Sequence, residues 1–234
     1  MDFLVVADER ETCPYLPDRT SRLPLRLPLS RVPPAEFDRL LAEGDRRAGP
    51  FLYRTACEGC RACEPLRIPV ARFAPSSSQR RAAKKNPDVA VEVGRPQVTP
   101  RHLEIYDRHR VERGLARNPE PTSARAYRMQ FVESCVETVE LRYLVAGRMI
   151  AFSILDLGET AVSSVYHCFD PDESRRSLGV FSVLAELSWC AERGVEHYYL
   201  GLWVGACPSL AYKAGYSPHQ RRIGGAWVEF DGPT

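Results

Sequence analysis

The spacing of apolar side chains predicts helices in four parts of the chain. They are expected over 33–43, from 99 to about 114, over 123–136 and over 177–193, with a short helical stretch at 210–213. Prolines at the first turn indicate where the first two helices begin. Gly44, Gly114 and Gly194 indicate where the first, second and fourth helices end.

Runs of apolar and β-branched residues predict strands between these helices. The expected strands cover 66–70, 139–145, 149–157, 160–169, 195–200 and 222–230. Ala146-Gly147 separates two of them and Gly158-Glu159 the next two, so both connections are expected to be hairpin turns.

The distribution of proline divides the chain near residue 98. Thirteen of the 19 prolines lie in the first 100 residues, where they favour extended or edge-strand backbone. We therefore expect an α+β protein with two domains: a small, irregular, mixed domain over 1–98 and a regular domain with a mixed sheet over 99–234.

The order of elements in the second half is typical of acyltransferases of the GNAT type. In that fold a loop leads from a long antiparallel strand to a helix start that binds the phosphates of the acyl donor. Here the loop spans 170–179, where Arg176, Ser177 and Gly179 are candidate anion-binding residues. A capped surface helix with solvated arginines would look the same.

Composition excludes several classes of protein. Of the 234 residues, 44% are hydrophobic and 26% charged, which argues against wholesale disorder. No apolar run approaches the roughly 18 residues of a membrane span, and the first residues do not form a signal peptide. We expect a cytoplasmic protein with reduced cysteines. Motifs of NTPases, dehydrogenases and zinc proteases are absent from the sequence.

Basic residues gather in one segment. Between Arg46 and Lys85 there are ten Arg or Lys and only two acids, although the net charge of the whole chain is +2. Tyr53, Arg54 and Arg67 lie in this segment, as do Ser78, Gln79, Arg80 and Arg81. Hydroxyls interleaved with cations suit contacts to nucleic-acid phosphates. A solvated surface patch is the alternative.

Cysteines form the sharpest local motif. Cys57, Cys60 and Cys63 are spaced by three residues, and Cys13 is a fourth thiol upstream. In a reduced compartment this spacing resembles the ligands of zinc or of an iron–sulfur cluster. Four small buried hydrophobic residues in a tight turn would give the same pattern.

Polar side chains at the ends of two predicted strands are candidates for catalysis. Tyr166 and Asp170 end one strand and Tyr199 lies near the end of another. Asp170 could orient an amine or accept its proton, and either tyrosine could donate to an oxyanion. Lys213 could bind a carboxylate, whereas His167 fits a packed histidine better than a base.

Taken in order, these segments resemble the bacterial aminoacyl-tRNA–protein transferases, which include the aspartate/glutamate leucyltransferases and, more distantly, eukaryotic arginyltransferases. The resemblance rests on segments along nearly the whole chain: Cys13–Pro17, Tyr53-Arg54, Cys57 to Cys63, Pro65–Val70, Ser78–Arg81, Val165-Tyr166, Phe169–Pro171, Ser177–Gly179, Tyr199–Gly201 and Tyr212–Ala214. The family's G-F-R-R-S-G stretch reads Gly44-Asp45-Arg46-Arg47-Ala48-Gly49 here.

This resemblance implies transfer of leucine from leucyl-tRNA to the N-terminal Asp or Glu of proteins, which marks them for degradation by the N-end rule pathway. It implies that the basic segment binds tRNA and that Arg54 and Arg67 read the acidic acceptor. The chemistry requires no cofactor, because the aminoacyl ester is already activated.

Three alternatives remain at this point. Arginine could be the donor amino acid with the same mechanism. An acyl-CoA N-acyltransferase of the GNAT type could use the 170–179 loop for pyrophosphate. A non-catalytic module that binds tRNA or metal could retain the fold. The sequence is silent on the oligomeric state.

Overall fold

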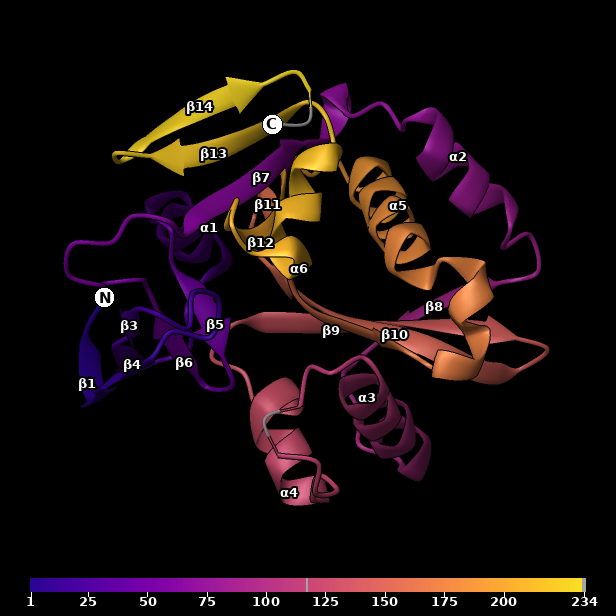
Figure 1. Cartoon of the computed structure of the whole chain (residues 1–234), viewed down its shortest axis with the longest axis horizontal. Helices are drawn as coiled ribbons and strands as arrows, with labels where there is room; N and C mark the ends of the chain where they lie inside the picture. Colours follow the sequence, from indigo (N-terminus) through magenta and orange to yellow (C-terminus); the bar gives the residue numbers. More distant parts are fainter. Residues whose placement is uncertain (117, 233–234) are drawn as a thin grey trace.

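A computed structural model describes residues 1–116 and 118–232. An eight-stranded mixed sheet crosses the molecule in the order β14-β13-β7-β12-β11-β10-β9-β8 (Figure 1). Its strands are β7 (Glu64–Pro69), β8 (Ala90–Gly94), β9 (Glu137–Val145), β10 (Arg148–Leu157), β11 (Ala161–Phe169), β12 (His197–Trp203), β13 (His219–Ile223) and β14 (Ala226–Phe230).

Helices cover both faces of this sheet. On one face, α5 (Leu178–Glu192) packs against β11 with α2 (Ser77–Lys84) beside it (Figure 1). On the other lie α3 (Pro100–Glu112) and α4 (Ala124–Tyr127), which continues into a π-helical turn (Arg128–Val132). Alternate residues of β10 supply both cores: Phe152 and Ile154 face α3 and α4, and Ala151 and Leu155 join the core under α5.

The first 63 residues build a smaller layer beside the large sheet (Figure 1). A four-stranded sheet has the order β1-β4-β6-β5 and a two-stranded sheet pairs β2 with β3. Phe37, Leu40 and Leu41 of α1 pack onto this layer. The elements are β1 (Phe3–Ala7), β2 (Arg10–Thr12), β3 (Thr20–Arg22), β4 (Leu25–Pro28), α1 (Pro34–Glu43), β5 (Arg46–Ala48) and β6 (Phe51–Tyr53).

Short helices complete the described chain. Three are 3₁₀ helices, at Val70–Arg72, Pro171–Arg176 and Tyr212–Gly215, and the fourth is α6 (Pro208–Ala211). The last two follow β12 and place Lys213 next to that strand, where it takes part in the site described below.

The expected α+β fold class is confirmed, as are the helices over 33–43, 99–114 and 177–193 and both hairpin turns. The helix expected over 123–136 is shorter, since α4 passes into the π-helical turn and ends at Val132. The strand expected over 222–230 is wrong: Gly224 and Gly225 both have positive φ and turn the chain into a hairpin. Helix α2 was not predicted from the sequence, although Ser76 and Gln79 form a capping box at its start.

The expected division near residue 98 does not interrupt the sheet. β7, from the first portion, lies between β12 and β13, and β8 pairs with β9. Strands from both sides of residue 98 therefore belong to one hydrogen-bonded sheet.

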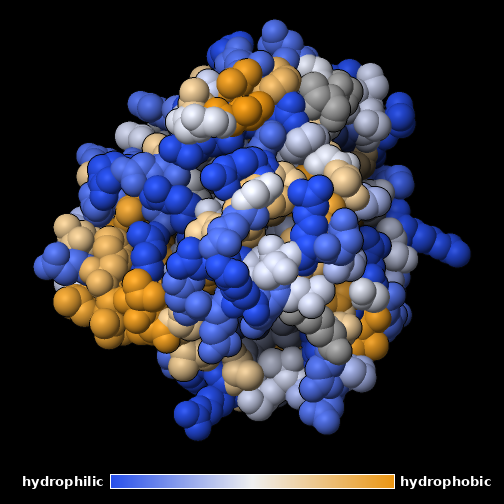
Figure 2. All heavy atoms as spheres, turned by 60° about the vertical axis from the view of Figure 1, so that its left-hand side comes forward, coloured by the Kyte–Doolittle hydropathy of each residue, from blue (hydrophilic) through white to orange (hydrophobic). Residues whose placement is uncertain are grey.

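The surface is mostly hydrophilic on the face that Figure 2 shows, with apolar side chains gathered in a few places. Leu4, Val5 and Val6 on the edge strand β1 are among the exposed apolar residues. Within the described residues, no helix combines the length and apolar character that crossing a membrane requires.

Candidate active site

The candidate site lies where two neighbouring strands of the large sheet separate. β11 and β12 run parallel but pair only from Ala161 to Ser163, opposite His197 to Tyr199. β11 continues to Phe169 and β12 to Trp203, so their facing edges lie open beyond the paired residues. Backbone groups on those edges need other hydrogen-bond partners. We call this opening the strand split.

Two cationic side chains bind carbonyl groups at the strand split. Arg46 of β5 donates to the carbonyl oxygen of Ser164 at 2.7 Å, and Lys213 donates to that of Leu202 at 2.9 Å. Gly201 lies between these cations. A Cβ atom at Gly201 would lie 2.9 Å from Lys213 Nζ and 3.4 Å from Arg46 Nη2. The bare backbone of Gly201, with φ +102°, therefore admits both cations.

The ammonium group of Lys213 is buried even though its side chain is partly exposed. Burial lowers the pKa of Lys213 to about 7, and the charge of Arg46 contributes to the decrease. Lys213 can therefore both hold and release a proton near neutral pH, which suits proton transfer.

Tyr15 lies near Tyr53, Cys63 and Arg46, on the side of the N-terminal layer. Burial raises the pKa of Tyr15 to about 12, with contributions from nearby Tyr53 and Cys63. The phenol of Tyr15 is therefore a neutral hydrogen-bonding group at physiological pH. Tyr53, which the sequence predicted as a substrate-binding residue, pairs with Arg46 across β5 and β6.

The four predicted cysteine ligands lie in one region but differ in character. Burial and the neighbouring Cys13 and Cys57 raise the pKa of Cys63 to about 12, whereas the backbone N–H of Ala62 and then Arg19 lower that of Cys60. Across the residues that the structure describes, no three Cys, His, Asp or Glu side chains are arranged to hold a metal ion. Zinc or iron–sulfur binding by these thiols stays a prediction.

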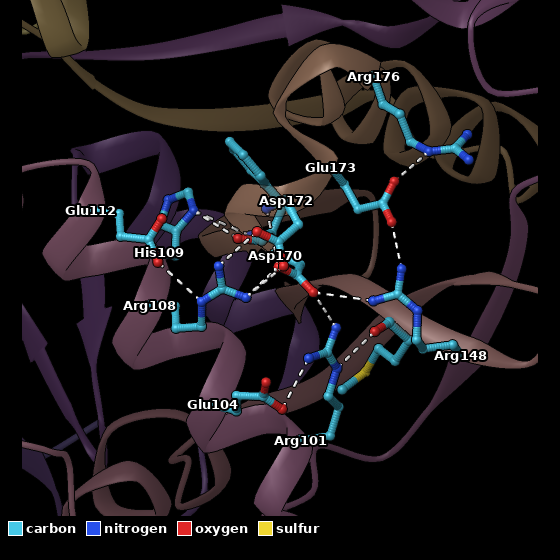
Figure 3. Close-up of polar contacts among 12 residues, drawn as sticks. Arg101, Glu104, Arg108, His109, Glu112, Arg148, Asp170, Asp172, Glu173 and Arg176 are labelled. Carbon is cyan, nitrogen blue, oxygen red and sulfur yellow. Dashed lines mark hydrogen bonds and ion pairs between the residues drawn. The ribbon is translucent and has the colours of Figure 1, made fainter.

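Asp170, the predicted amine-binding residue, is the centre of an ion-pair network (Figure 3). It is 2% exposed, and Arg101, Arg108 and Arg148 all bind its carboxylate. Burial raises the pKa of Asp170, but the hydrogen bond and charge of Arg101 together with the charge of Arg108 outweigh it, leaving the pKa lowered. A carboxylate so strongly held favours a structural role over proton transfer.

The two predicted catalytic tyrosines lie in separate clusters of side chains. Tyr166 packs among Tyr106 and Phe131 next to α3 and the π-helical turn, and burial raises its pKa. Tyr199 accepts a hydrogen bond from Arg67 at 3.1 Å. Arg67 also stacks on Trp227, so Arg67 and Tyr199 form one unit away from Tyr166.

Two of the predicted anion-binding arginines are already paired. Arg54 binds Glu43 and the buried Asp45. Arg176 binds Asp88 and Glu173. Both must give up acidic partners before they can bind a substrate.

Of the remaining predicted site residues, one is buried and the others lie at the surface or at the start of a helix. Gln79 is buried and donates to the carbonyl of Gly215. Ser78, Arg80 and Arg81 are exposed on α2. Ser177 and Gly179 are at the start of α5, where Ser177 accepts a hydrogen bond from Lys85.

Arg46 was not singled out from the sequence as a site residue. Arg46 lies in the Gly44–Gly49 segment, which is similar to a stretch of the transferase family described above. A pair of adjacent arginines is common on protein surfaces, however, and did not by itself indicate a site residue. Only the three-dimensional position of β5 beside β11 identifies Arg46 with the strand split.

Comparison with known proteins decides the family. Residues 101–223 match the family described as arginine-tRNA-protein transferase, C terminus, and residues 11–81 match the corresponding N terminus. The chain belongs to the arginine-tRNA-protein transferase family. This membership confirms the resemblance inferred from the sequence segments.

Within this transferase family, the chain is similar to proteins named aspartate/glutamate leucyltransferase. That of Halorhodospira halophila is 37% identical over 92% of both chains. That of Pseudomonas putida is 33% identical over 95% of this chain and 94% of its own. The family description and the names of these transferases thus differ in the amino acid they specify.

Solved structures with a similar arrangement are more distant from this transferase. The match to FemX spans 70% of this chain and 59% of the FemX chain, with 7% sequence identity and a TM-score of 0.44. The ribosomal-protein-S18-alanine N-acetyltransferase of Escherichia coli covers 45% of the chain and 63% of its own, with 19% identity and a TM-score of 0.33.

Proposed function

We propose that this protein transfers leucine from leucyl-tRNA to the N-terminal Asp or Glu of acceptor proteins. The observation that carries this proposal is the similarity to aspartate/glutamate leucyltransferases at 37% identity over 92% of both chains. The product would carry an N-terminal leucine, a signal for degradation by the N-end rule pathway. Because charged tRNA is a cytoplasmic substrate, we place the reaction in the cytoplasm.

The strand split supplies what the reaction needs. The acceptor's α-amine attacks the ester carbonyl of leucyl-tRNA, forming the new C–N bond while negative charge develops on the carbonyl oxygen. Arg46 is positioned to stabilise that charge, since its guanidinium already binds a carbonyl at this point. Neutral Lys213 takes the proton that the amine loses and returns it to the ribose oxygen as the C–O bond breaks.

Positioning of the substrates accounts for much of the remaining acceleration. An α-amine has a pKa of about 7.7–8.0, so an appreciable fraction is neutral at pH 7. Holding this amine against the ester converts a bimolecular reaction into an effectively intramolecular one. Arg67 is the better candidate of the two predicted acceptor-binding arginines, because its partners Tyr199 and Gln220 are uncharged.

Binding of tRNA fits the exposed face of α2. Arg80, Arg81, Lys84 and Lys85 form no ion pair with an acid among the described residues, nor does nearby Arg175. Lys85 donates to the carbonyl oxygen of Arg175, so the cations of α2 and of the Pro171–Arg176 helix adjoin. Unpaired cations on one surface can contact phosphates without first giving up a partner. We call these five residues the α2 basic surface.

The acyl-CoA alternative is less well supported. It required the loop over 170–179 to bind a pyrophosphate through arginines. Arg176 is held by Asp88 and Glu173, and three of the ten residues of the same loop are acidic. An incoming pyrophosphate would meet carboxylates as well as cations there.

Transfer assays test the proposed function directly. Purified protein would be given radiolabelled leucyl-tRNA or arginyl-tRNA and peptides beginning with Asp, Glu or Ala. We expect leucine on the Asp and Glu peptides only, with incorporation lost after ribonuclease treatment of the donor. Absence of transfer from leucyl-tRNA by folded protein would contradict the proposal, and arginine transfer alone would change the donor.

Removing two charges from the α2 basic surface is expected to weaken tRNA binding. The double variant R81A/K84A should lower affinity, and the slope of log K against log salt should fall by about 1 for each lost phosphate contact. Fluorescence anisotropy of labelled tRNA between 50 and 200 mM KCl would measure both, with R39A as the control because Glu36 and Glu43 pair with Arg39. An unchanged slope would place tRNA elsewhere.

A further inference from the structure

A cavity of about 370 Å³ opens beside the strand split. Its wall comes from β5, β6 and the turn between them, the π-helical turn and the second half of β11, and Arg47 and Gln130 are among its lining residues. Aromatic and aliphatic side chains dominate it: Phe51, Tyr53, Met129, Phe131, Val165 and Tyr166. None of these residues has been assigned a part in the transfer so far, apart from Tyr53 and Tyr166 as sequence candidates.

Gly49 fixes the distance between two walls of this cavity. A Cβ atom at Gly49 would lie 2.6 Å from the backbone oxygen of Met129, and the residue has φ +59°. The β5–β6 turn can therefore approach the π-helical turn only because position 49 lacks a side chain. Single π-helical turns often occur at functional sites.

The cavity begins one residue from the proposed reaction centre. Val165 lines it and directly follows Ser164, whose carbonyl oxygen accepts the hydrogen bond from Arg46. A substrate whose reacting carbonyl lies near Arg46 can thus extend a side chain into the cavity. In the proposed reaction that carbonyl belongs to the donor amino acid.

The chemistry of the walls disfavours charged side chains. None of the residues that line the cavity is acidic. The guanidinium of Arg47 is fully buried, where it binds Asp156 and the carbonyl oxygen of Gly49. Its Nη2 has no hydrogen-bond partner among the described residues but is closed off from solvent.

Aliphatic, basic and acidic side chains differ in the free energy of transfer from water into this cavity. An aliphatic side chain gains from leaving water. A guanidinium would lose its hydration and find no carboxylate to pair with. An acidic side chain would also lose hydration without reaching a free cation, because Arg47 is enclosed and paired.

We propose that this cavity holds the side chain of the donor amino acid and selects leucine over arginine. The inference rests on the proposed leucyl transfer and adds the residues that determine its donor specificity. Met129 and Val165 are the positions at which the selection can be changed, since Met129 is 42% exposed and Val165 is partly exposed.

An introduced carboxylate should alter donor selection. In M129E the new carboxylate can pair with a guanidinium and interferes with an aliphatic side chain. We expect the ratio of kcat/KM for leucyl-tRNA to that for arginyl-tRNA to fall about tenfold or more. L29E adds the same charge at a site that is 67% exposed in the N-terminal layer and should leave the ratio unchanged.

A second variant reduces the space instead of changing the charge. V165F should lower kcat/KM for leucyl-tRNA about tenfold while the KM of the acceptor peptide stays the same. Melting temperatures of both variants would be compared with that of the wild-type protein, so that loss of folding is recognised.

The outcomes separate the inference from the proposed function. A donor ratio within twofold of wild type in both folded variants, with leucyl transfer intact, would overturn the cavity assignment alone. A rise in acceptor KM without a change in donor specificity would also overturn it, since the occupant would then be the acceptor. Wild-type protein that transfers from neither tRNA would overturn the proposed function and this inference with it.

Discussion

Replacing Lys213 by methionine is expected to remove most of the transfer activity while making the protein more stable below pH 7. Loss of a positioned proton acceptor typically costs about 10²–10⁴-fold in rate. Steady-state kinetics with leucyl-tRNA and an Asp peptide would measure the loss in kcat.

The expected gain in stability follows from the pKa of Lys213. Its value of about 7 in the folded protein lies below the ordinary 10.5, so the unfolded chain binds this proton more tightly. The lysine therefore destabilises the fold fully below pH 7, and the penalty decreases as pH rises from about 7 towards 10.5. Thermal unfolding at pH 6 and pH 9 should show a gain for K213M that is larger at pH 6.

The variant K213R distinguishes proton transfer from a fixed positive charge. Arginine keeps the cation at all relevant pH values but does not release its proton. If Lys213 accepts the proton of the amine, K213R is nearly as inactive as K213M. Activity close to wild type in K213R would show that only the charge is needed and would contradict the proposed role.

Replacing Asp170 by alanine is expected to destabilise the protein by about 1–3 kcal/mol, because it removes a buried carboxylate that binds three arginines that are themselves partly exposed. Arg101, Arg108 and Arg148 would lose the carboxylate that they share. For a protein of this size the melting temperature should fall by about 2–12 °C. Circular dichroism on heating and urea denaturation would measure the change.

Asp172 provides a matched control for this prediction. Its side chain is 71% exposed and binds Arg108 in the same network. Because exposed ion pairs contribute little to stability, D172A should leave the melting temperature nearly unchanged. A D170A protein with unchanged melting temperature but no activity would instead support the catalytic role that the sequence suggested.

Acid should reduce the difference between D170A and the wild-type protein. The folded-state pKa of Asp170 lies below the ordinary 3.8, so its stabilising contribution is complete above about pH 3.8. That contribution is lost as the pH falls through the lowered folded-state pKa. Urea denaturation at pH 3 and pH 6 would compare the two proteins.

The sequence predicted elements whose signals are local. Proline at the first turn and glycine at the end identified α1, and apolar spacing identified α5. The last hairpin was missed because Gly224 and Gly225 interrupt a run that otherwise fits one strand. Helix α2 was missed because its exposed face is basic and its apolar face is narrow.

The candidate site was only partly predictable because its contacts are distant in the sequence. Lys213 and Tyr53 were named and lie at or near the strand split. Asp170 had the strand-end position of a catalytic residue, but its arginine partners come from α3 and β10, and no local pattern indicated that they converge. Arg46 meets Ser164 across 118 positions, a pairing set by tertiary packing.

The position of β7 in the sheet has a consequence for how the chain is made. Ile68 pairs with Tyr198, which is synthesised 130 residues later. At about 5–20 residues per second, β7 is synthesised roughly 7–26 s before its partner strand. During that delay its apolar edge is open to the wrong neighbours. Pro65 and Pro69 lie near its two ends and lack the N–H groups that strand addition requires, which limits premature pairing until translation is nearly complete.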